Sequence, residues 1–305
     1  MLPRRNFLRQ TATATSLLGF GAFPWKAMAS PQITKLTILH TNDVHSRIDP
    51  FPMDGSRNQG LGGVARRSQL IREIRVQEPN VLLLDSGDIF QGTPYFNFFG
   101  GELEIKLMSE MGYDATTIGN HDFDAGIEGL VSQLPHATFP FINCNYDFDQ
   151  TLLRGLTKPY QIFDKAGVKI GILGVGIELV GLVPEKLFGA TRYLDPVVEA
   201  NRIADHLRNE EKCDYIICLS HLGYKYESEK IDDIKFARNS RNIDLVLGGH
   251  THTFMQAPEL VSNRENKQVM INQVGWAGII LGRIDVLFEK NRKNRCLTCQ
   301  NLTVR

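Results

Sequence analysis

The sequence predicts a layered α/β domain. From residue 33 onward, short apolar runs with strand character alternate with stretches of helical period, and this alternation is typical of α/β domains. Polar clusters rich in Asp, His and Asn follow five of the apolar runs, where strands are expected to end. With 42% hydrophobic and 22% charged residues, the 305-residue chain has the composition of a globular protein with a sizeable core.

The expected elements follow from apolar periodicity and from breaking residues. An amphipathic helix is expected over residues 62–78, and Pro79-Asn80 should end it. Further helices are expected over 102–111, 196–209 and 231–238. Strands are expected over 36–39, 81–84, 115–118, 140–143, 168–175, 215–219 and 243–247.

The last region, residues 269–272 and 279–288, is predicted to form paired strands with turns at Gly275 and Gly278. We find no internal repeat, low-complexity tract or linker after residue 30. The sequence therefore predicts a single domain.

Basic and acidic residues balance, with 34 Lys and Arg against 34 Asp and Glu. Proteins that bind the phosphate backbone of nucleic acids usually carry a basic excess. The composition therefore argues against a nucleic-acid polymer as the main partner.

The first 29 residues differ from the rest. Arg4-Arg5 precedes a mildly apolar stretch, and Ala27-Met28-Ala29 has small residues where a signal peptidase would cut. The apolar stretch is too short for a stable membrane span. We therefore expect residues 1–29 to be a twin-arginine signal peptide that exports the folded protein to the periplasm or the medium, leaving residues 30–305. The alternative is an amphipathic N-terminus without an export role.

The five cysteines give an odd count. Cys144, Cys213 and Cys218 lie in or beside apolar runs, where buried thiols are common. Cys296 and Cys299 form a single Cys-x-x-Cys pair, whereas a structural zinc site needs two such pairs or added histidines. A local disulfide between them stays open.

Five polar clusters share one position, directly after a predicted strand. In an open α/β sheet the carboxyl ends of the strands converge on one crevice, so these clusters can meet in space. Five of the eight histidines belong to them. The clusters are Asp43 and His45; Asp88; Asn120, His121 and Asp124; His221; and His250 and His252.

The residue types in these clusters suit a pair of divalent metal ions. Carboxylate, imidazole and amide ligands fit Mn, Zn or Fe and disfavour a soft thiolate site. The spacing of two in Asp43-x-His45 and His250-x-His252 puts both side chains on one side of an extended segment. A carboxylate such as Asp88 can bridge two ions with its two oxygens.

Together these motifs resemble a known family. The motifs, in order, are Asp43-x-His45, Gly87-Asp88, Gly119-Asn120-His121-Asp122, His221 and Gly249-His250-x-His252. In this order they resemble the calcineurin-type metallophosphoesterases, specifically the catalytic domain of the bacterial periplasmic 5′-nucleotidase family, from about residue 35 to about residue 288. The resemblance implies a four-layer α-β-β-α sandwich over residues 30–305. It also implies hydrolysis of small phosphoesters of nucleotide type, as in a 5′-nucleotidase or a cyclic phosphodiesterase.

The resemblance further implies a role for each motif residue. A water activated by two metal ions would attack phosphorus. The ligands implied for the first ion are Asp43, His45, Asp88 and His252, and those for the second are Asp88, Asn120, His221 and His250. His121 would stabilise the transition state or protonate the leaving oxygen, and Asp124 would orient it.

Several of these residues could have structural roles that need no metal centre. The clustered histidines could be loop residues bonded to the backbone, and Asp124 could cap a helix that begins near Gly126. Asp122 is expected to support a turn or to lie behind the ligands, Asp85 is expected to support a turn, and His40 could lie behind the ligands. The phenylalanines within residues 90–99 are expected to pack in the core or a loop rather than to stack on a base.

The resemblance stops at the C-terminus. Nucleotidases of this family carry a second domain that selects the nucleotide, and we expect this chain, which ends at Arg305, to lack it. Three functions stay open: a hydrolase acting alone, a catalytic subunit whose specificity domain is a separate polypeptide, and a non-enzymatic binding protein. The third is disfavoured because every expected ligand is present. Thiosulfate-ester hydrolysis is a minor chemical alternative.

Overall fold

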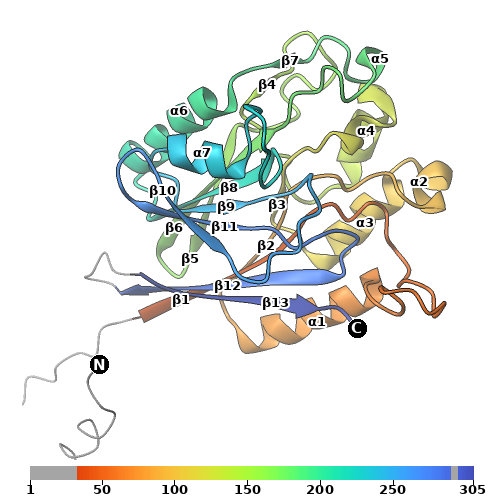
Figure 1. Cartoon of the computed structure of the whole chain (residues 1–305), viewed down its shortest axis with the longest axis horizontal. Coiled ribbons are helices and arrows are strands. Elements are labelled where there is room, and N and C mark those ends of the chain that lie inside the picture. Colours follow the sequence, from red (N-terminus) through yellow and green to blue (C-terminus); the bar gives the residue numbers. More distant parts are fainter. Residues whose placement is uncertain (1–32, 290–294) are drawn as a thin grey trace, which may run out of the picture. The chain divides into compact units, whose positions relative to one another are not determined.

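Two β-sheets stacked face to face form the centre of the domain (Figure 1). The computed structural model describes residues 33–289 and 295–305, so the signal peptide predicted over residues 1–29 lies outside the described residues. The first sheet has the order β13 (Arg295–Thr303), β12 (Ile280–Glu289), β1 (Ile33–Thr41), β2 (Val81–Asp85) and β3 (Ala115–Thr116). The second has the order β10 (Glu259–Ser262), β11 (Gln268–Asn272), β9 (Leu245–Leu247), β8 (Tyr215–His221), β6 (Val168–Gly176) and β5 (Tyr160–Lys165).

Helices cover the outer face of each sheet. Buried residues of α1 (Val64–Gln77), α3 (Glu102–Met111) and α4 (Gly126–Gln133) share one core cluster with the outer face of the first sheet. Residues of α6 (Pro196–Asn209) and α7 (Asp233–Asn239) do the same on the second sheet. The remaining short elements are α2 (Pro94–Phe99), η1 (His121–Phe123), η2 (Leu134–His136), β4 (Tyr146–Asp147), α5 (Glu185–Phe188) and β7 (Arg192–Tyr193).

The four layers follow from strands that are apolar on both faces. Along a strand, successive side chains point to opposite sides of the sheet. In β2, Leu82 and Leu84 therefore enter the core between the two sheets, whereas Leu83 packs under the helices. In β8, Leu219 lies in the central core and Cys218 in the outer one. This arrangement is the predicted α-β-β-α sandwich.

The strands that carry the polar clusters run parallel within each sheet. β1 pairs with β2, and β2 pairs with β3, in parallel. β8 lies between β6 and β9, also in parallel. Their carboxyl ends therefore lie at one edge of each sheet, as the sequence predicted.

Two predicted strand assignments were wrong. Residues 269–272 and 279–288 do not pair with each other, because β11 pairs with β9 and β10 whereas β12 pairs with β1 and β13 in the other sheet. The segment between them passes from one sheet to the other instead of forming a hairpin. Residues 140–143 form isolated bridges through Phe141 and Ile142 rather than a strand.

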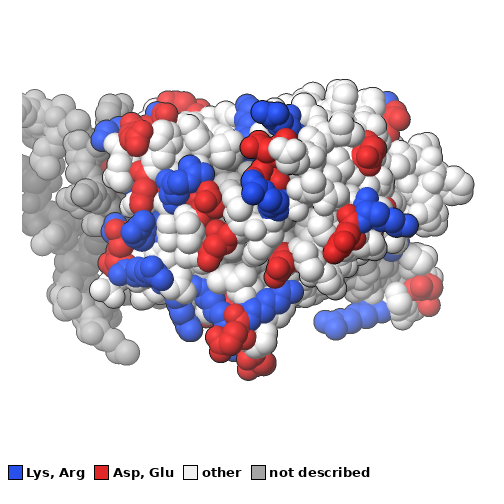
Figure 2. Space-filling view, turned by 90° about the horizontal axis from the view of Figure 1, so that it is seen from above, with Lys and Arg blue, Asp and Glu red and all other residues white. Residues whose placement is uncertain are grey.

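Basic and acidic side chains are interspersed on the face of the domain shown in Figure 2. This face therefore presents no basic stripe of the kind that tracks a nucleic-acid backbone. Within the described residues, no helix has both the length and the apolar character that a membrane crossing requires.

All three predicted buried thiols are confirmed. Among the described residues, Cys144, Cys213 and Cys218 are buried and form no disulfide. Cys299 is partly exposed and has no disulfide partner among the side chains that the structure describes. The side chain of Cys296 lies outside the described residues, so the Cys-x-x-Cys pair stays unassigned.

Candidate metal centre

The ends of strands from both sheets bring the predicted ligands together. Two groups of three side chains are arranged so that each could hold a metal ion. Within each group, the ligand atoms lie within 4.8 Å of one another. One group is Asp43, His45 and His252, and the other is Asp88, His221 and His250. All six were predicted from the sequence as metal ligands.

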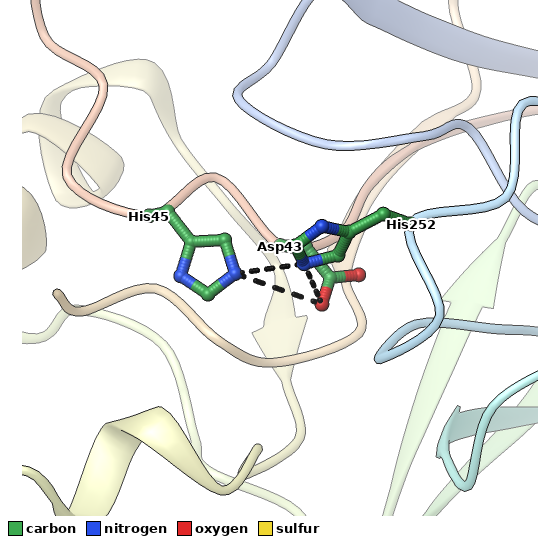
Figure 3. Close-up of side chains that lie close together, drawn as sticks. All are labelled: Asp43, His45 and His252. Carbon is green, nitrogen blue, oxygen red and sulfur yellow. Dashed lines mark hydrogen bonds and ion pairs between the residues drawn. The ribbon is translucent and has the colours of Figure 1, made fainter. Parts of the chain in front are cut away.

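The first group joins the end of β1 to the loop that follows β9 (Figure 3). Nε2 of His45 lies 3.0 Å from Nε2 of His252, and Nε2 of His252 lies 3.4 Å from Oδ1 of Asp43. Nε2 of His45 lies 4.0 Å from the same carboxylate oxygen. With bonds of about 2.1 Å, two ligand atoms on one tetrahedral ion lie about 3.4 Å apart. The group therefore has the dimensions of a single-ion site.

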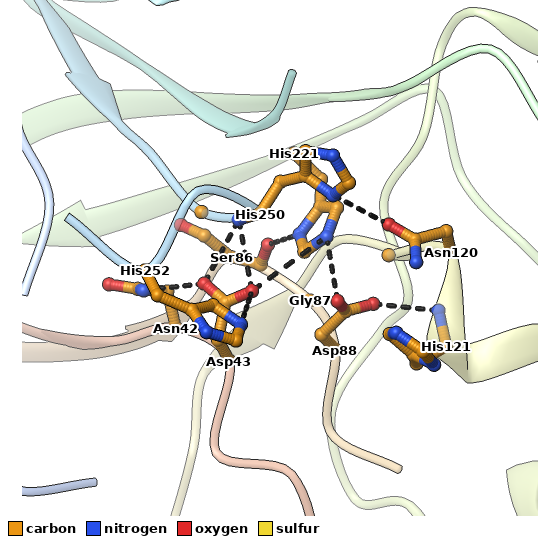
Figure 4. Close-up of polar contacts among 12 residues, drawn as sticks. Asn42, Asp43, Ser86, Gly87, Asp88, Asn120, His121, His221, His250 and His252 are labelled. Atoms are coloured by element: carbon orange, nitrogen blue, oxygen red, sulfur yellow. Dashed lines mark hydrogen bonds and ion pairs between the residues drawn. The ribbon is translucent and has the colours of Figure 1, made fainter. Parts of the chain in front are cut away.

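The second group joins β8 to the loops after β2 and β9 (Figure 4). Nε2 of His221 lies 3.1 Å from Oδ2 of Asp88. Nδ1 of His250 lies 2.7 Å from Oδ1 of Asn120, the seventh predicted ligand. The amide oxygen of Asn120 thus reaches the same group.

Asp88, a member of the second group, also faces the first. Its Oδ2 is 3.1 Å from Nε2 of His221 and 3.8 Å from Nε2 of His45. One carboxylate therefore faces a histidine of each group, which is the position that a bridging ligand requires.

The ring nitrogen of His221 tests whether the site fits a metal. His221 is fully buried, and within the described part of the chain its Nε2 makes no hydrogen bond although it lies close to Asp88. The close approach is an ion-pair distance without hydrogen-bond geometry. A buried nitrogen without a hydrogen bond is costly, whereas a divalent cation between nitrogen and carboxylate would satisfy both groups. The donor set therefore fits Mn, Zn or Fe.

The backbone around the ligands is strained. Five of the seven predicted ligands have positive φ angles, in the left-handed region that residues other than glycine seldom adopt. These are Asp43 (50°), His45 (51°), Asp88 (56°), His250 (71°) and His252 (52°). Such strain persists only where the surrounding structure enforces it, and it concentrates at functional sites.

His121 and Asp124 meet in the turn formed by η1. Nδ1 of His121 lies 2.8 Å from Oδ2 of Asp124, so the predicted contact is present. The capping alternative for Asp124 is not observed, because α4 has Ala125 at its N-cap and no side-chain cap bond. The backbone N–H of His121 also donates to Oδ1 of Asp88 at 2.8 Å. The His121–Asp124 pair therefore lies directly beside the candidate metal centre.

Asp122 links the loop that carries Asp88 to the turn that begins at Gly119 by hydrogen bonds. Its buried carboxylate accepts hydrogen bonds from the backbone N–H groups of Gly119 (2.8 Å), Asp88 (3.0 Å), Ile89 (2.8 Å) and Phe90 (3.2 Å). A Cβ atom at Gly119 would lie 2.2 Å from Oδ1 of Asp88, so only glycine allows the loops to approach this closely. Asp122 therefore has the supporting role predicted for it.

Asp85 likewise supports a turn. Its carboxylate accepts from Oγ1 of Thr41 at 2.5 Å and from the backbone N–H of Gly87 at 2.9 Å. Burial raises the pKa of Asp85 to about 6. His40 accepts a hydrogen bond from Asn272 between the sheets. Nε2 of His206, on α6, lies 3.1 Å from the Tyr160 hydroxyl.

Electrostatic effects among the clustered side chains are large and opposed. Burial disfavours the charged form of both Asp88 and His221, but their mutual attraction outweighs it, lowering the pKa of Asp88 and raising that of His221 to about 10. Burial lowers the pKa of His250 to about 3. The hydrogen bond to Asp124 raises the pKa of His121. Burial, followed by the charge of Asp88, raises the pKa of Asp122 to about 7.

Several residues that hold the candidate ligands were not predicted from the sequence. Nδ2 of Asn42 donates to Oδ2 of Asp43 and to the carbonyl of Gly275, both at 2.6 Å. The carbonyl of Ser86 lies 2.6 Å from Nδ1 of His221. Trp276 stacks on His252. Only Asn42, next to a predicted ligand, carried a sequence signal, because the other contacts depend on backbone geometry or on a distant turn.

Comparisons with known proteins agree with this geometry. The chain is 35% identical over 275 residues to the snake venom 5′-nucleotidase of Gloydius brevicauda, a match that covers 84% of this chain and 45% of the relative. It is 33% identical over 308 residues to the 5′-nucleotidase of Vibrio cholerae, covering 93% of this chain and 54% of the relative. The chain thus spans about half the length of these curated relatives.

A solved structure and a family model agree with the relatives. The 5′-nucleotidase precursor of Thermus thermophilus matches with a TM-score of 0.81 and 30% identity, over 89% of this chain and 55% of that one. Residues 36–254 match the model for calcineurin-like phosphoesterases, and this segment contains all the predicted ligands. The chain therefore belongs to the calcineurin-like phosphoesterase family.

Proposed function

We propose that this chain hydrolyses phosphoesters of nucleotide type at a centre of two divalent metal ions. The observation that carries the proposal is the pair of adjacent ligand groups, with Asp88 of the second group also facing the first. Asp43, His45 and His252 would hold one ion. His221, His250 and Asn120 would hold the other, and Asp88 would contact both.

The remaining catalytic roles belong to the bound ions and to the His121–Asp124 pair. When bound, two divalent cations would supply a nucleophilic water at neutral pH and neutralise charge on the phosphoryl oxygens. Asp124 holds Nδ1 of His121 and so fixes the orientation of the ring. Nε2 of His121 then donates a proton or a hydrogen bond to the phosphoryl group or to the leaving oxygen.

The proposed substrate class is supported by the relatives, which are named 5′-nucleotidases. Because the chain matches about half of each relative, nucleotide choice needs direct measurement. The test is a panel of nucleoside monophosphates, 2′,3′-cyclic nucleotides, UDP-sugars and simple phosphoesters, assayed with Mn²⁺, Zn²⁺ and Fe²⁺.

The metal-dependent chemistry has a simpler test. Purified protein should contain close to two transition-metal ions and should hydrolyse p-nitrophenyl phosphate or its bis ester. Chelation should abolish the activity, and added metal should restore it. Full activity in metal-free protein would overturn the proposal, as would inactivity towards every ester in the panel with both metal sites filled.

A second candidate is a catalytic subunit whose specificity domain is a separate polypeptide. The relatives are longer than the segments that this chain matches, which cover 45% and 54% of them. A partner that co-purifies with the native protein and lowers KM for nucleotides would favour this candidate. Isolation of the native protein alone, with high nucleotidase activity, would exclude it.

We also propose export to the periplasm or the medium by the twin-arginine route. Arg4-Arg5 supports the route, and the Thermus relative is named a precursor. Replacing both arginines by lysine should retain the protein in the cytoplasm, which cell fractionation would show.

A further inference from the structure

The indole of Trp276 lies parallel to the imidazole ring of a candidate metal ligand, His252. The rings of Trp276 and His252 are nearly parallel, with an interplanar angle of 8° and centroids 5.6 Å apart. His252 is the more exposed histidine of its group, with 39% of its side chain accessible against 9% for His45. Surrounding protein therefore restrains His252 less than it restrains His45.

His252 also differs from its neighbours in hydrogen bonding. Histidines that bind metals usually donate their second ring N–H to a carbonyl or carboxylate, which fixes the ring. Nδ1 of His45 lies 3.2 Å from the carbonyl of Phe90, and Nδ1 of His221 lies 2.6 Å from that of Ser86. Within residues 33–289 and 295–305, no hydrogen-bond partner reaches Nδ1 of His252. Instead of an in-plane hydrogen bond, His252 has the indole of Trp276 packed parallel to its ring.

Trp276 is itself held in place from a second side. The ring of Phe51 packs against the indole edge to face, with centroids 5.7 Å apart and an interplanar angle of 77°. The guanidinium of Arg47 lies 4.2 Å from the centroid of the Phe51 ring. The indole is therefore packed between the ligand loop and an aromatic side chain.

The backbone of the Trp276 turn is tied to both segments that supply the ligands. The N–H of Gly275 donates to the carbonyl of Thr253 at 2.9 Å, next to His252. The N–H of Ala277 donates to the carbonyl of Asp43 at 2.7 Å. The turn thus fixes the distance between the two loops while the indole fixes the ring.

We propose that Trp276 is a positioning residue for His252, acting through the ring stack that keeps Nε2 turned towards Asp43 and His45. This inference rests on the proposed metal centre. The flat contact blocks rotation of the imidazole, so the ligand is oriented before an ion arrives. Loss of the indole should weaken one ion site and spare the other.

The first test measures the fluorescence of Trp276 itself. The chain has two tryptophans, Trp25 and Trp276, so Trp25→Phe in the full chain leaves a single indole. Co²⁺ quenches indole fluorescence at short range, and titration should quench it in step with filling of one of two sites measured by calorimetry. Fluorescence that stays unchanged while both sites fill would overturn the proposal.

The second test compares metal affinity among variants. Trp276→Leu should raise the Kd of one Mn²⁺ ion by roughly 10- to 100-fold, the usual effect of losing a ligand-orienting group. The Kd of the other ion should change by no more than about twofold, the limit expected for sites that do not interact. Trp276→Phe keeps a flat ring and should recover part of the affinity. Phe98→Leu is the matched control, because Phe98 is 81% exposed and lies on α2.

The outcomes separate this inference from the proposed function. If wild-type protein binds no metal, the metal centre and the role of Trp276 both fail. If wild-type and Trp276→Leu bind two ions equally well, only the role of Trp276 fails. Equal weakening of both sites in Trp276→Leu and in Trp276→Phe would also overturn it, because that pattern indicates a general structural defect.

Discussion

The backbone N–H of His121 donates a hydrogen bond to Oδ1 of Asp88 at 2.8 Å. The other oxygen of the same carboxylate faces His221 at 3.1 Å and His45 at 3.8 Å. Asp88 therefore contacts the turn carrying the His121–Asp124 pair and also faces both ligand groups.

Asp88→Asn should remove metal and activity together. The amide lacks the charge that a bridging ligand contributes, and its NH2 group cannot coordinate an ion. We expect loss of at least one bound ion and a fall in kcat of at least roughly 10²–10³-fold, comparable to losing a preorganised electrostatic contact. Metal content and p-nitrophenyl phosphate turnover would check this. Asp54→Asn, at an exposed loop carboxylate, is the control, and a fully active Asp88→Asn enzyme would rule out the binuclear centre.

His121→Ala should lower the rate of hydrolysis and leave metal binding unchanged. Because the backbone N–H of residue 121 remains, the bond to Asp88 is kept and both ions should still bind. The rate should fall by about 10²–10⁴-fold, the usual contribution of a positioned acid or base. Asp124→Asn should have a smaller effect, about 10- to 100-fold, because it only orients the ring. Normal turnover by His121→Ala with both ions bound would exclude the proposed role.

Asp122→Ala should destabilise the fold. It removes the acceptor for four backbone N–H groups, and each buried donor left unpaired costs about 1–3 kcal/mol. We expect the free energy of unfolding to fall by at least ~2 kcal/mol, measured by urea denaturation of metal-free protein. Asp122→Asn keeps one oxygen and should cost less. Equal stability of wild type and Asp122→Ala would show that these bonds are replaceable.

Asp233 should make stability depend on pH. Burial raises the pKa of Asp233 to about 8, against about 4 in an unfolded chain. Between these values the folded protein keeps a proton that the unfolded chain has lost, so stability falls as pH rises through the window and is level above about pH 8.

Asp233→Asn removes that titration. The stability of this variant relative to wild type should increase by a few kcal/mol between about pH 5 and about pH 8, as measured by denaturant melts. The amide oxygen can still accept from Oγ of Ser220, which lies 2.5 Å from the carboxylate in the wild type. Asp149→Asn, at an exposed turn, is the control for replacing a carboxylate by an amide. A constant difference across the pH range would refute the assigned pKa.

The local pattern of apolar residues was sufficient to predict most of the helices and strands. The helix expected over 196–209 is α6 with the same bounds, and β2 and β8 begin where predicted. The pairing of residues 269–272 with 279–288 was wrong because strand partners depend on distant segments. Gly275 and Gly278 marked turns correctly, but a turn residue does not say whether the chain reverses within a sheet or crosses to another one.

The sequence by itself determined which side chains gather at the candidate site, because polar clusters follow parallel strands whose carboxyl ends lie at one edge of a sheet. It identified the six side chains that the structure brings together and the contact between His121 and Asp124. Only the tertiary structure decided how they are held. The stack of Trp276 on His252 and the bonds to Asp122 join segments that folding alone brings into contact. No spacing along one chain encodes such distances, because they arise from the packing of two sheets against each other.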